Sequence, residues 1–256
     1  MLNLAYSEHG SGQPLIIIHG LFGASSNWRS IARRLACSFH VYTVDLRNHG
    51  RSPWSDDMSY RTLATDIADF ITTHNLHGSH VMGHSLGGKT AMALALQHPQ
   101  LLKHLAVLDI APVAYSHTQI DYIQAMQALN LDTIKRRSDA DAALQEGVPD
   151  TVLRQFLLQN LVPDGDGFEW RINLDALADQ MDEMIGFPTF AEQQYNGPTL
   201  FIYGMDSDYV LAKYHSAVRT YFPTAQMLGI ENAEHWLHVQ KPNRVVDAIN
   251  HFLNAD

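Results

Sequence analysis

Apolar and polar residues follow two alternating patterns along the first half of the chain. Short runs rich in β-branched and other apolar residues predict buried strands, and between them the apolar residues recur at helical spacing. The predicted strands, with their following turns, are residues 14–20, 40–50, 78–85 and 102–112, and the helices are residues 27–35, 58–75 and 86–99. This order of elements is typical of parallel βαβ units in an α/β fold.

The pattern changes after Pro112. Residues 113–195 predict successive helices, over 118–130, 138–147, 149–161 and 173–185, with one short hairpin arm in 167–173. Strand and helix patterns then resume, over 197–204, 209–222, 225–230 and 242–254. We therefore predict a single domain, in which residues 1–112 and 196–256 form the core and residues 113–195 form an inserted cap. Open α/β sheets bind ligands at the carboxyl ends of their strands, so we interpret this insertion as a lid.

Composition narrows the function classes. The net charge of −10 disfavours nucleic-acid binding, and a hydrophobic content of 46% over 256 residues is sufficient for one large core. The single cysteine, Cys37, cannot form an intramolecular disulfide; we expect a small core residue in a reducing compartment. No basic leader precedes an apolar stretch, and no apolar run approaches the roughly 18 residues of a membrane span. A cytoplasmic protein without membrane association is expected.

The octapeptide GHSLGGKT, residues 83–90, matches two catalytic signatures. As G-x-S-x-G it is a nucleophile elbow, in which Ser85 attacks an acyl group. As G-x-x-x-x-G-K-[ST] it is a phosphate-binding loop, in which Lys89 and Thr90 hold a nucleotide and its magnesium. The apolar run that ends at Asp109 resembles a strand that supports the metal of a nucleotide hydrolase. The two interpretations predict an ester hydrolase or an NTPase.

Steric requirements favour the elbow. A phosphate loop commonly has small residues between its glycines, whereas both neighbours of Ser85 are bulky. An elbow requires glycine two positions before and two positions after the nucleophile, where a Cβ would collide, and Gly83 and Gly87 occupy those positions. Lys89 and Thr90 then become ordinary residues of the first helical turn.

Two further segments fit a hydrolase. HGLFG, residues 19–23, follows the first strong strand, and its backbone at Leu21 is expected to supply one N–H of an oxyanion hole. Leu86, the residue after the nucleophile, supplies the second N–H. NAEHWLH, residues 232–238, places His235 in the loop after the last strand. A general base belongs there, because the chain order Ser, Asp, His brings the last loop over the elbow.

The chain holds 15 histidines, so most of them must be structural or surface residues. His235 is preferred to His238 as the base because it is nearer the strand end. His74, His77 and His80 have H-x-x-H spacing, but no carboxylate at ligand spacing accompanies them. No metal site is predicted.

Several motifs together resemble those of the α/β-hydrolase superfamily, in particular its small YbfF-type esterases. They are HGLFG, DLRNHGRS, GHSLGGKTAMALAL, LDIAPVAY and AEHW. The likeness spans nearly the whole chain and is weakest in residues 113–195. It implies a mostly parallel sheet of eight strands with helices on both faces, a helical cap and no cofactor.

The resemblance bears on the acid of the triad. In most α/β hydrolases the acid follows the penultimate strand in a G-x-x-D pattern, but here Ser207 stands at that position, between Asp206 and Asp208. The YbfF-type esterases instead place the acid where this chain has Asp109. We favour Asp109, with Ser207 as an added hydrogen-bond partner of His235, and keep Asp206 and Asp208 as alternatives.

The predicted function is that of a serine esterase, which transfers an acyl group to water through an acyl-enzyme. Esters of short to medium acyl chains, or acyl thioesters such as acyl-CoA, are the expected small-molecule substrates. Phe22 and Trp236 are expected to line the acyl pocket. The alternatives are a P-loop NTPase and a non-catalytic binding protein on a hydrolase fold, because fold does not determine function. The sequence leaves the natural substrate and the oligomeric state open.

Overall fold

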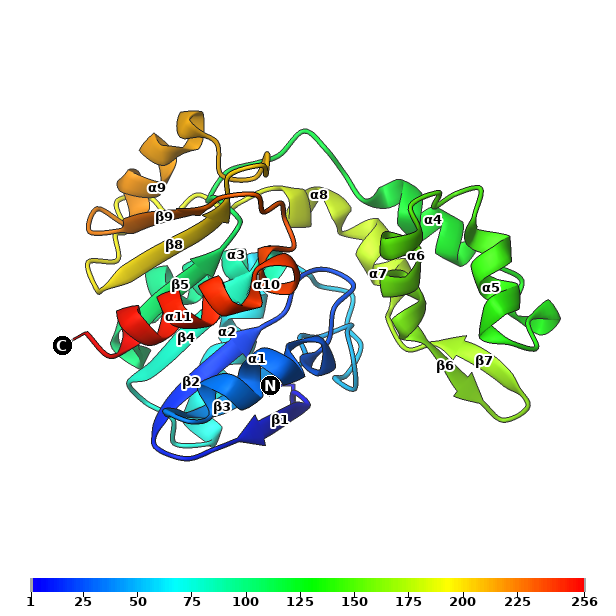
Figure 1. Ribbon diagram of the computed structural model, residues 1–256, viewed down its shortest axis with the longest axis horizontal. Coiled ribbons are helices and arrows are strands. Elements are labelled where there is room, and N and C mark those ends of the chain that lie inside the picture. Colours follow the sequence, from blue (N-terminus) through cyan, green and yellow to red (C-terminus); the bar gives the residue numbers. More distant parts are fainter. Residues whose placement is uncertain (1, 256) are drawn as a thin grey trace.

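The computed structural model describes residues 2–255 and is built around one twisted sheet (Figure 1). Its strand order is β1-β3-β2-β4-β5-β8-β9, and every neighbouring pair is parallel except β1 with β3. The strands are β1 (Tyr6–His9), β2 (Gln13–Ile18), β3 (Phe39–Val44), β4 (Ser79–His84), β5 (Leu102–Leu108), β8 (Thr199–Gly204) and β9 (Gln226–Ile230).

The sheet has seven strands in the described residues, so the expected number of eight is wrong by one. The segment before β2 is too short for two strands: β1 is its one strand, paired antiparallel with the edge of β3. Strand β1 was also absent from the predicted elements. Its sequence, YSEH, is largely polar and lacks the apolar run that marks the other strands.

Helices cover both faces of the sheet, as predicted. Because strand side chains alternate between faces, β2 sends Ile16 and Ile18 into one core cluster and Leu15 and Ile17 into the other. One face packs against α1 (Arg29–Leu35), α10 (Leu237–Gln240) and α11 (Pro242–Leu253). The other packs against α2 (Tyr60–Thr73), α3 (Leu86–Gln97) and α9 (His215–Tyr221). Burial on both faces explains consecutive apolar residues such as Leu15 to Ile18 of β2.

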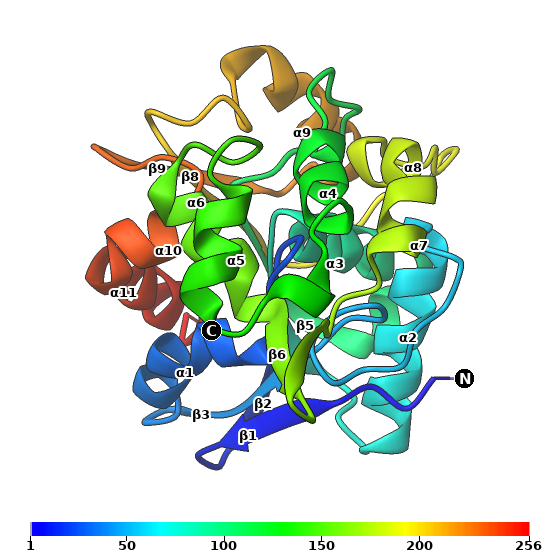
Figure 2. The same cartoon turned by 90° about the vertical axis from the view of Figure 1, so that its right-hand side faces the viewer.

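Residues 113–195, here called the cap, lie between β5 and β8 in the chain and form a lobe to one side of the core (Figure 1). Figure 2 views this lobe face-on, in front of the sheet. The cap consists of α4 (Ile120–Gln127), α5 (Arg137–Leu144), α6 (Thr151–Leu157), the hairpin β6 (Leu161–Asp164) and β7 (Gly167–Trp170), α7 (Leu174–Asp179) and α8 (Met181–Ile185).

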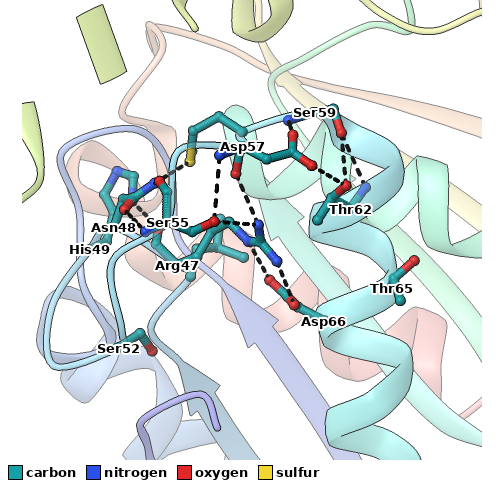
Figure 3. Close-up of polar contacts among 12 residues, drawn as sticks. Arg47, Asn48, His49, Ser52, Ser55, Asp57, Ser59, Thr62, Thr65 and Asp66 are labelled. Carbon is teal, nitrogen blue, oxygen red and sulfur yellow. Dashed lines mark hydrogen bonds and ion pairs between the residues drawn. The ribbon is translucent and has the colours of Figure 1, made fainter. Parts of the chain in front are cut away.

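The loop after β3 is held by a buried ion pair (Figure 3). Arg47 donates two hydrogen bonds to Asp66 of α2, from Nε to Oδ2 at 2.6 Å and from Nη2 to Oδ1 at 2.8 Å. Both side chains are buried. The guanidinium also donates to Ser55 Oγ and to the Asp57 carbonyl. The buried charge is thus paired and makes four hydrogen bonds, two of which join the loop after β3 to α2.

Two asparagines fasten the cap to the core. Asn173 donates through its backbone N–H to the carbonyl of Asn48 and through Nδ2 to Asn48 Oδ1, each at 3.1 Å. Asn160 Nδ2 donates to the carbonyl of Phe22 at 2.8 Å. Each contact joins the cap to a loop at the carboxyl end of a core strand, so the cap is seated over that edge.

Cys37 is exposed, which corrects the expectation of a core residue. It lies in the turn between α1 and β3, two positions beyond Leu35, the last buried residue of the helix. Among the described residues, no helix combines the length and apolar content that crossing a membrane requires.

Candidate active site

Ser85 occupies the turn between β4 and α3, with φ 53° and ψ −118°. This left-handed conformation is strained for a residue with a Cβ, and the glycines on either side make it possible. A Cβ on Gly83 would lie 2.1 Å from the carbonyl oxygen of Gly87, and one on Gly87 would lie 2.4 Å from that of Ile18. The strand thus turns sharply into the helix and leaves Ser85 Oγ on the cavity side.

Three residues from three strand ends form one hydrogen-bonded chain. Ser85 Oγ lies 3.0 Å from His235 Nε2, and His235 Nδ1 lies 2.8 Å from Asp109 Oδ2. Asp109 is fully buried and follows β5, whereas His235 lies in the loop after β9. A carboxylate at Nδ1 accepts the proton of that nitrogen, which leaves Nε2 free to accept the hydroxyl proton of Ser85.

The carboxylate of Asp109 has two further donors. The Gly204 N–H donates to Oδ1 at 2.9 Å, and the Ser207 hydroxyl donates to Oδ2. The expectation that Ser207 binds His235 is therefore wrong: among the described hydrogen bonds, the Ser207 hydroxyl contacts the acid and not the base. Backbone N–H of Tyr209 donates in turn to Ser207 Oγ at 3.3 Å. These donors hold the carboxylate with Oδ2 toward the imidazole.

The alternative acids, Asp206 and Asp208, are both exposed. Within residues 2–255 neither side chain forms a hydrogen bond with His235. The Asp206 backbone instead donates to the Ala233 carbonyl at 3.0 Å, which ties the turn after β8 to the loop that carries the imidazole. Of the three carboxylates, Asp109 is the one that the fold places against His235.

The imidazole of His235 is held from two further directions. The Tyr209 ring stacks on it, with ring centroids 3.8 Å apart and planes inclined by 19°. His84 Nε2 lies 2.9 Å from the His235 carbonyl and donates to it when that nitrogen carries the proton. Burial lowers the pKa of His84 well below its usual value, so this neighbour stays neutral and adds no positive charge beside the base.

The two backbone N–H groups expected to form an oxyanion hole both border the cavity. They belong to Leu21 and Leu86, and within residues 2–255 neither donates to a protein acceptor. Leu86 begins α3, so its N–H is one of the donors that a helix start leaves unpaired. The arrangement can stabilise a negative oxygen.

Two buried histidines shape the loop that carries Leu21. His49 Nε2 accepts the N–H of Phe22 at 3.3 Å, and Phe22 has a positive φ of 61°. Burial, reinforced by the neighbouring His19, lowers the pKa of His49 to about 3, so its ring is a neutral acceptor. His19 Nε2 accepts the Leu46 N–H at 3.0 Å. The Phe22 N–H is thus engaged by His49, whereas the neighbouring Leu21 N–H has no acceptor among the described hydrogen bonds.

A cavity of about 750 Å³ lies between the core and the cap, and Ser85 lines it. Its walls are largely apolar, and both predicted pocket residues, Phe22 and Trp236, line it. The Trp236 ring meets Phe156 of α6, with centroids 5.5 Å apart, so core and cap touch across the cavity. Further walls come from Trp28, Leu153, Met181, Met184, Ile185 and Val239.

Lys89 lies in the first turn of α3, as predicted, but it is no ordinary helix residue. Its side chain is buried and its Nζ donates to the carbonyls of Ile185 and Gly186, which belong to the cap. Thr90 Oγ1 donates to the Leu86 carbonyl within the helix. A phosphate-binding loop would need both side chains at its mouth, and here both are engaged elsewhere. The largely apolar run LGGKTAMALAL around Lys89 is the sequence feature that could have indicated that this lysine is buried.

The histidines at H-x-x-H spacing do not gather around one point. His80 pairs with His104, at 2.9 Å between their Nδ1 atoms, whereas His74 packs on Tyr6 and Phe70. Residues 2–255 contain no group of three or more His, Cys, Asp or Glu side chains placed to hold a metal.

Comparison with known proteins agrees with this geometry. Residues 13–242 match the family described as alpha/beta hydrolase fold. The chain belongs to the α/β-hydrolase family. Curated relatives include mouse sn-1-specific diacylglycerol lipase ABHD11, 42% identical over 93% of this chain and 80% of that protein. Escherichia coli esterase YbfF is 35% identical over 98% of this chain and 96% of that protein.

A solved structure agrees closely with this α/β hydrolase over its whole length. The marine microorganism esterase superposes with a TM-score of 0.95 at 37% identity, covering 98% of this chain and 100% of the other. The relatives place this α/β hydrolase among hydrolases of the esterase and lipase type.

Proposed function

We propose that this protein is a serine esterase that works through Ser85, His235 and Asp109. The observation that carries the proposal is the continuous hydrogen-bonded chain from Ser85 Oγ through the imidazole to Asp109, set at a strained elbow. Relatives named as esterase and lipase support the reaction class.

The proposed reaction uses these groups in turn. His235 Nε2 accepts the proton of Ser85 as Oγ attacks the ester carbonyl, and the N–H groups of Leu21 and Leu86 stabilise the resulting oxyanion. The imidazolium, stabilised by Asp109, then protonates the leaving alcohol. Water, deprotonated by the same nitrogen, then attacks the acyl-enzyme. The imidazolium returns this proton to Ser85 Oγ as the acyl–oxygen bond breaks, and the carboxylic acid is released.

The cavity supports an apolar acyl ester as substrate. A volume of about 750 Å³ lies within the range of small-molecule sites, and its walls are supplied by Phe22, Trp236 and cap side chains. We propose that the cap, residues 113–195, acts as the lid that selects among substrates. Short to medium acyl chains fit this volume. Thioesters react through the same kind of acyl-enzyme, so they are included among the substrates tested.

The test combines covalent capture with turnover. A fluorophosphonate probe is expected to label the protein, and Ser85→Ala is expected to abolish labelling and to lower p-nitrophenyl ester turnover by about three orders of magnitude or more. Ser216→Ala is the matched control: Ser216 is exposed on α9, so this variant keeps both activities. Labelling that persists in Ser85→Ala would refute the proposed nucleophile.

A parallel arm addresses the two alternatives. Labelled MgATP is not expected to be retained, because the Lys89 amine is bound to cap carbonyls. Retention that is lost in Lys89→Ala would instead support an NTPase. A protein that is not labelled and turns over no ester or thioester in a panel of chain lengths would support a binding module.

A further inference from the structure

Lys89 is a buried amine that the proposed mechanism does not use. It lies one helical turn after the nucleophile, and its backbone N–H donates to the Ser85 carbonyl at 3.0 Å. The side chain is 1% exposed and borders the cavity. Its Nζ lies over the rings of Tyr115, at 4.8 Å, and Tyr60, at 5.5 Å. Among the described residues no carboxylate lies within ion-pair distance of it.

The partners of this amine are backbone carbonyls at the end of α8. Lys89 Nζ donates to the Ile185 carbonyl at 2.9 Å and also to that of Gly186. The last carbonyls of a helix lack intrahelical donors and favour a nearby cation. Two more donors reach the same turn. Tyr60 Oη of the core donates to the Met184 carbonyl at 2.6 Å, and the N–H of Tyr115, at the start of the cap, donates to that of Ile185 at 3.0 Å.

This turn forms a wall of the cavity. Met181, Met184 and Ile185 of α8 all line it, and α8 is the part of the cap that lies between the core and the other cap helices (Figure 1). Lys89 lies one helical turn after Ser85 in the same backbone. The hydrogen bonds from its Nζ to the end of α8 therefore set the distance between this wall and the nucleophile.

We propose that Lys89 is a positioning residue that determines substrate specificity by holding the α8 wall of the cavity. It acts through Met181, Met184 and Ile185 and takes no part in bond making. The proposal rests on the esterase function for its kinetic test. The substrate feature that it governs is the size of the apolar group, acyl or alcohol, that packs against α8.

The test compares Lys89→Met, which keeps the length of the side chain and removes the donors, with wild type. Two series of p-nitrophenyl and alkyl esters are used, one varying the acyl chain from acetyl to decanoyl and one varying the alcohol. In Lys89→Met we expect one of the two series to change its size preference. For that series, the kcat/KM of the largest ester divided by that of the smallest should rise about tenfold relative to wild type. One or two methylenes provide discrimination of this size. The kcat for the smallest ester should stay within a few-fold of wild type.

Three further variants make the result specific. Lys89→Arg, which retains donors, is expected to restore most of the wild-type preference. Lys103→Met makes the same chemical change at an exposed position on β5 and should leave both series unchanged. Tyr60→Phe removes the separate tie to Met184 and should shift the same series in the same direction by a smaller factor. If Lys89→Met does not fold, a Tyr60→Phe protein with an unchanged size preference overturns the proposal, because a looser α8 wall would then not affect specificity.

Hydrogen exchange separates this inference from the esterase proposal. Amides of residues 181–190 are expected to exchange faster in Lys89→Met than in wild type, and this readout needs no turnover. Ester activity that survives in Ser85→Ala refutes the proposed function, whatever the exchange shows. A folded Lys89→Met protein with an unchanged size preference, or with a uniform loss for every ester, overturns the role proposed for Lys89.

Discussion

His235 Nδ1 lies 2.8 Å from Asp109 Oδ2, although 126 positions separate the two residues in the chain. The contact joins the loop after β9 to the end of β5, and β8 lies between these two strands in the sheet. The side chain of Asp109 therefore reaches across the end of β8. There the Gly204 N–H donates to the second carboxylate oxygen of Asp109, Oδ1, at 2.9 Å.

The first prediction concerns this acid. Asp109→Asn offers the imidazole a donor in place of an acceptor, so the wrong tautomer is favoured and kcat is expected to drop by about 10⁴, as for the same change in a serine protease. Asp206→Asn and Asp208→Asn alter exposed side chains and should stay within a few-fold of wild type. The measurement is kcat for a p-nitrophenyl ester. A severe loss in either exposed variant, with a mild one at Asp109, would assign the acid to the turn after β8.

The second prediction concerns Ser207, whose hydroxyl donates to Asp109. Ser207→Ala removes one of several donors to the carboxylate and should lower kcat by about tenfold or less, since the Gly204 N–H still holds the group. Because both residues act through one imidazole, Asp109→Asn combined with Ser207→Ala should be little worse than Asp109→Asn alone. Multiplicative losses in the double variant would show that Ser207 acts independently of the acid.

A third prediction concerns the elbow. Gly83→Ala would place a Cβ 2.1 Å from a carbonyl oxygen of α3, so backbone must move, and we expect a loss of about 3 kcal/mol or more in the free energy of unfolding. Gly165→Ala, in the β6–β7 turn, has open space around its Cβ. It should lose only the cost of placing alanine at a φ of +53°, about 1–2 kcal/mol in the free energy of unfolding. Urea unfolding of the two variants measures the difference. Equal losses would mean that sterics at the elbow are unimportant.

The fourth prediction concerns acid stability. The pKa of buried His49 is lowered to about 3 from an ordinary value of 6.5, so the unfolded chain binds this proton first as the pH falls. Its contribution to stability is complete above about pH 6.5 and is lost as the pH falls toward 3. By pH 5 the loss is about 2 kcal/mol, at 1.36 kcal/mol for each pH unit.

His49→Gln keeps an acceptor for the Phe22 N–H and removes the titration. Its unfolding free energy should therefore fall less between pH 7 and pH 5 than that of wild type, as measured by urea unfolding at both pH values. His251→Gln, at an exposed position of α11, serves as the control and should keep the full wild-type decline. An unchanged pH dependence in His49→Gln would assign the acid sensitivity to other groups.

The parts of the fold that the sequence predicted are those with a strong local pattern. Strands buried on both faces read as apolar runs, and β2, with Leu15 to Ile18 fully buried, is an example. Strand β1 has no such run, because it lies at the edge of the sheet and its backbone pairs on one side only. Cys37 was misplaced because a helix end gives no local signal of where burial stops.

In the candidate site, too, the residues within a local motif were predictable, and those positioned by distant contacts were not. Ser85 and the glycines around it form a local motif, so their arrangement was predictable from spacing. The choice among Asp109, Asp206 and Asp208 was not, because it depends on which side chains at two adjacent strand ends point toward the last loop. The partner of the Ser207 hydroxyl and the burial of Lys89 depend on contacts across more than 90 positions, and no local pattern encodes them.

The insertion of the cap between β5 and β8 also affects how the chain is made. Strand β5 pairs with β4 on one side and with β8 on the other, and β8 begins only at Thr199. While the ribosome synthesises residues 109–198, which takes on the order of ten seconds, the edge of β5 that later pairs with β8 has no partner. An unpaired edge of this kind is a template for pairing with other chains, so this stage of synthesis is the one most exposed to aggregation. Chains that stop within the cap would carry Ser85 and Asp109 but no base, and would be released as inert, aggregation-prone fragments.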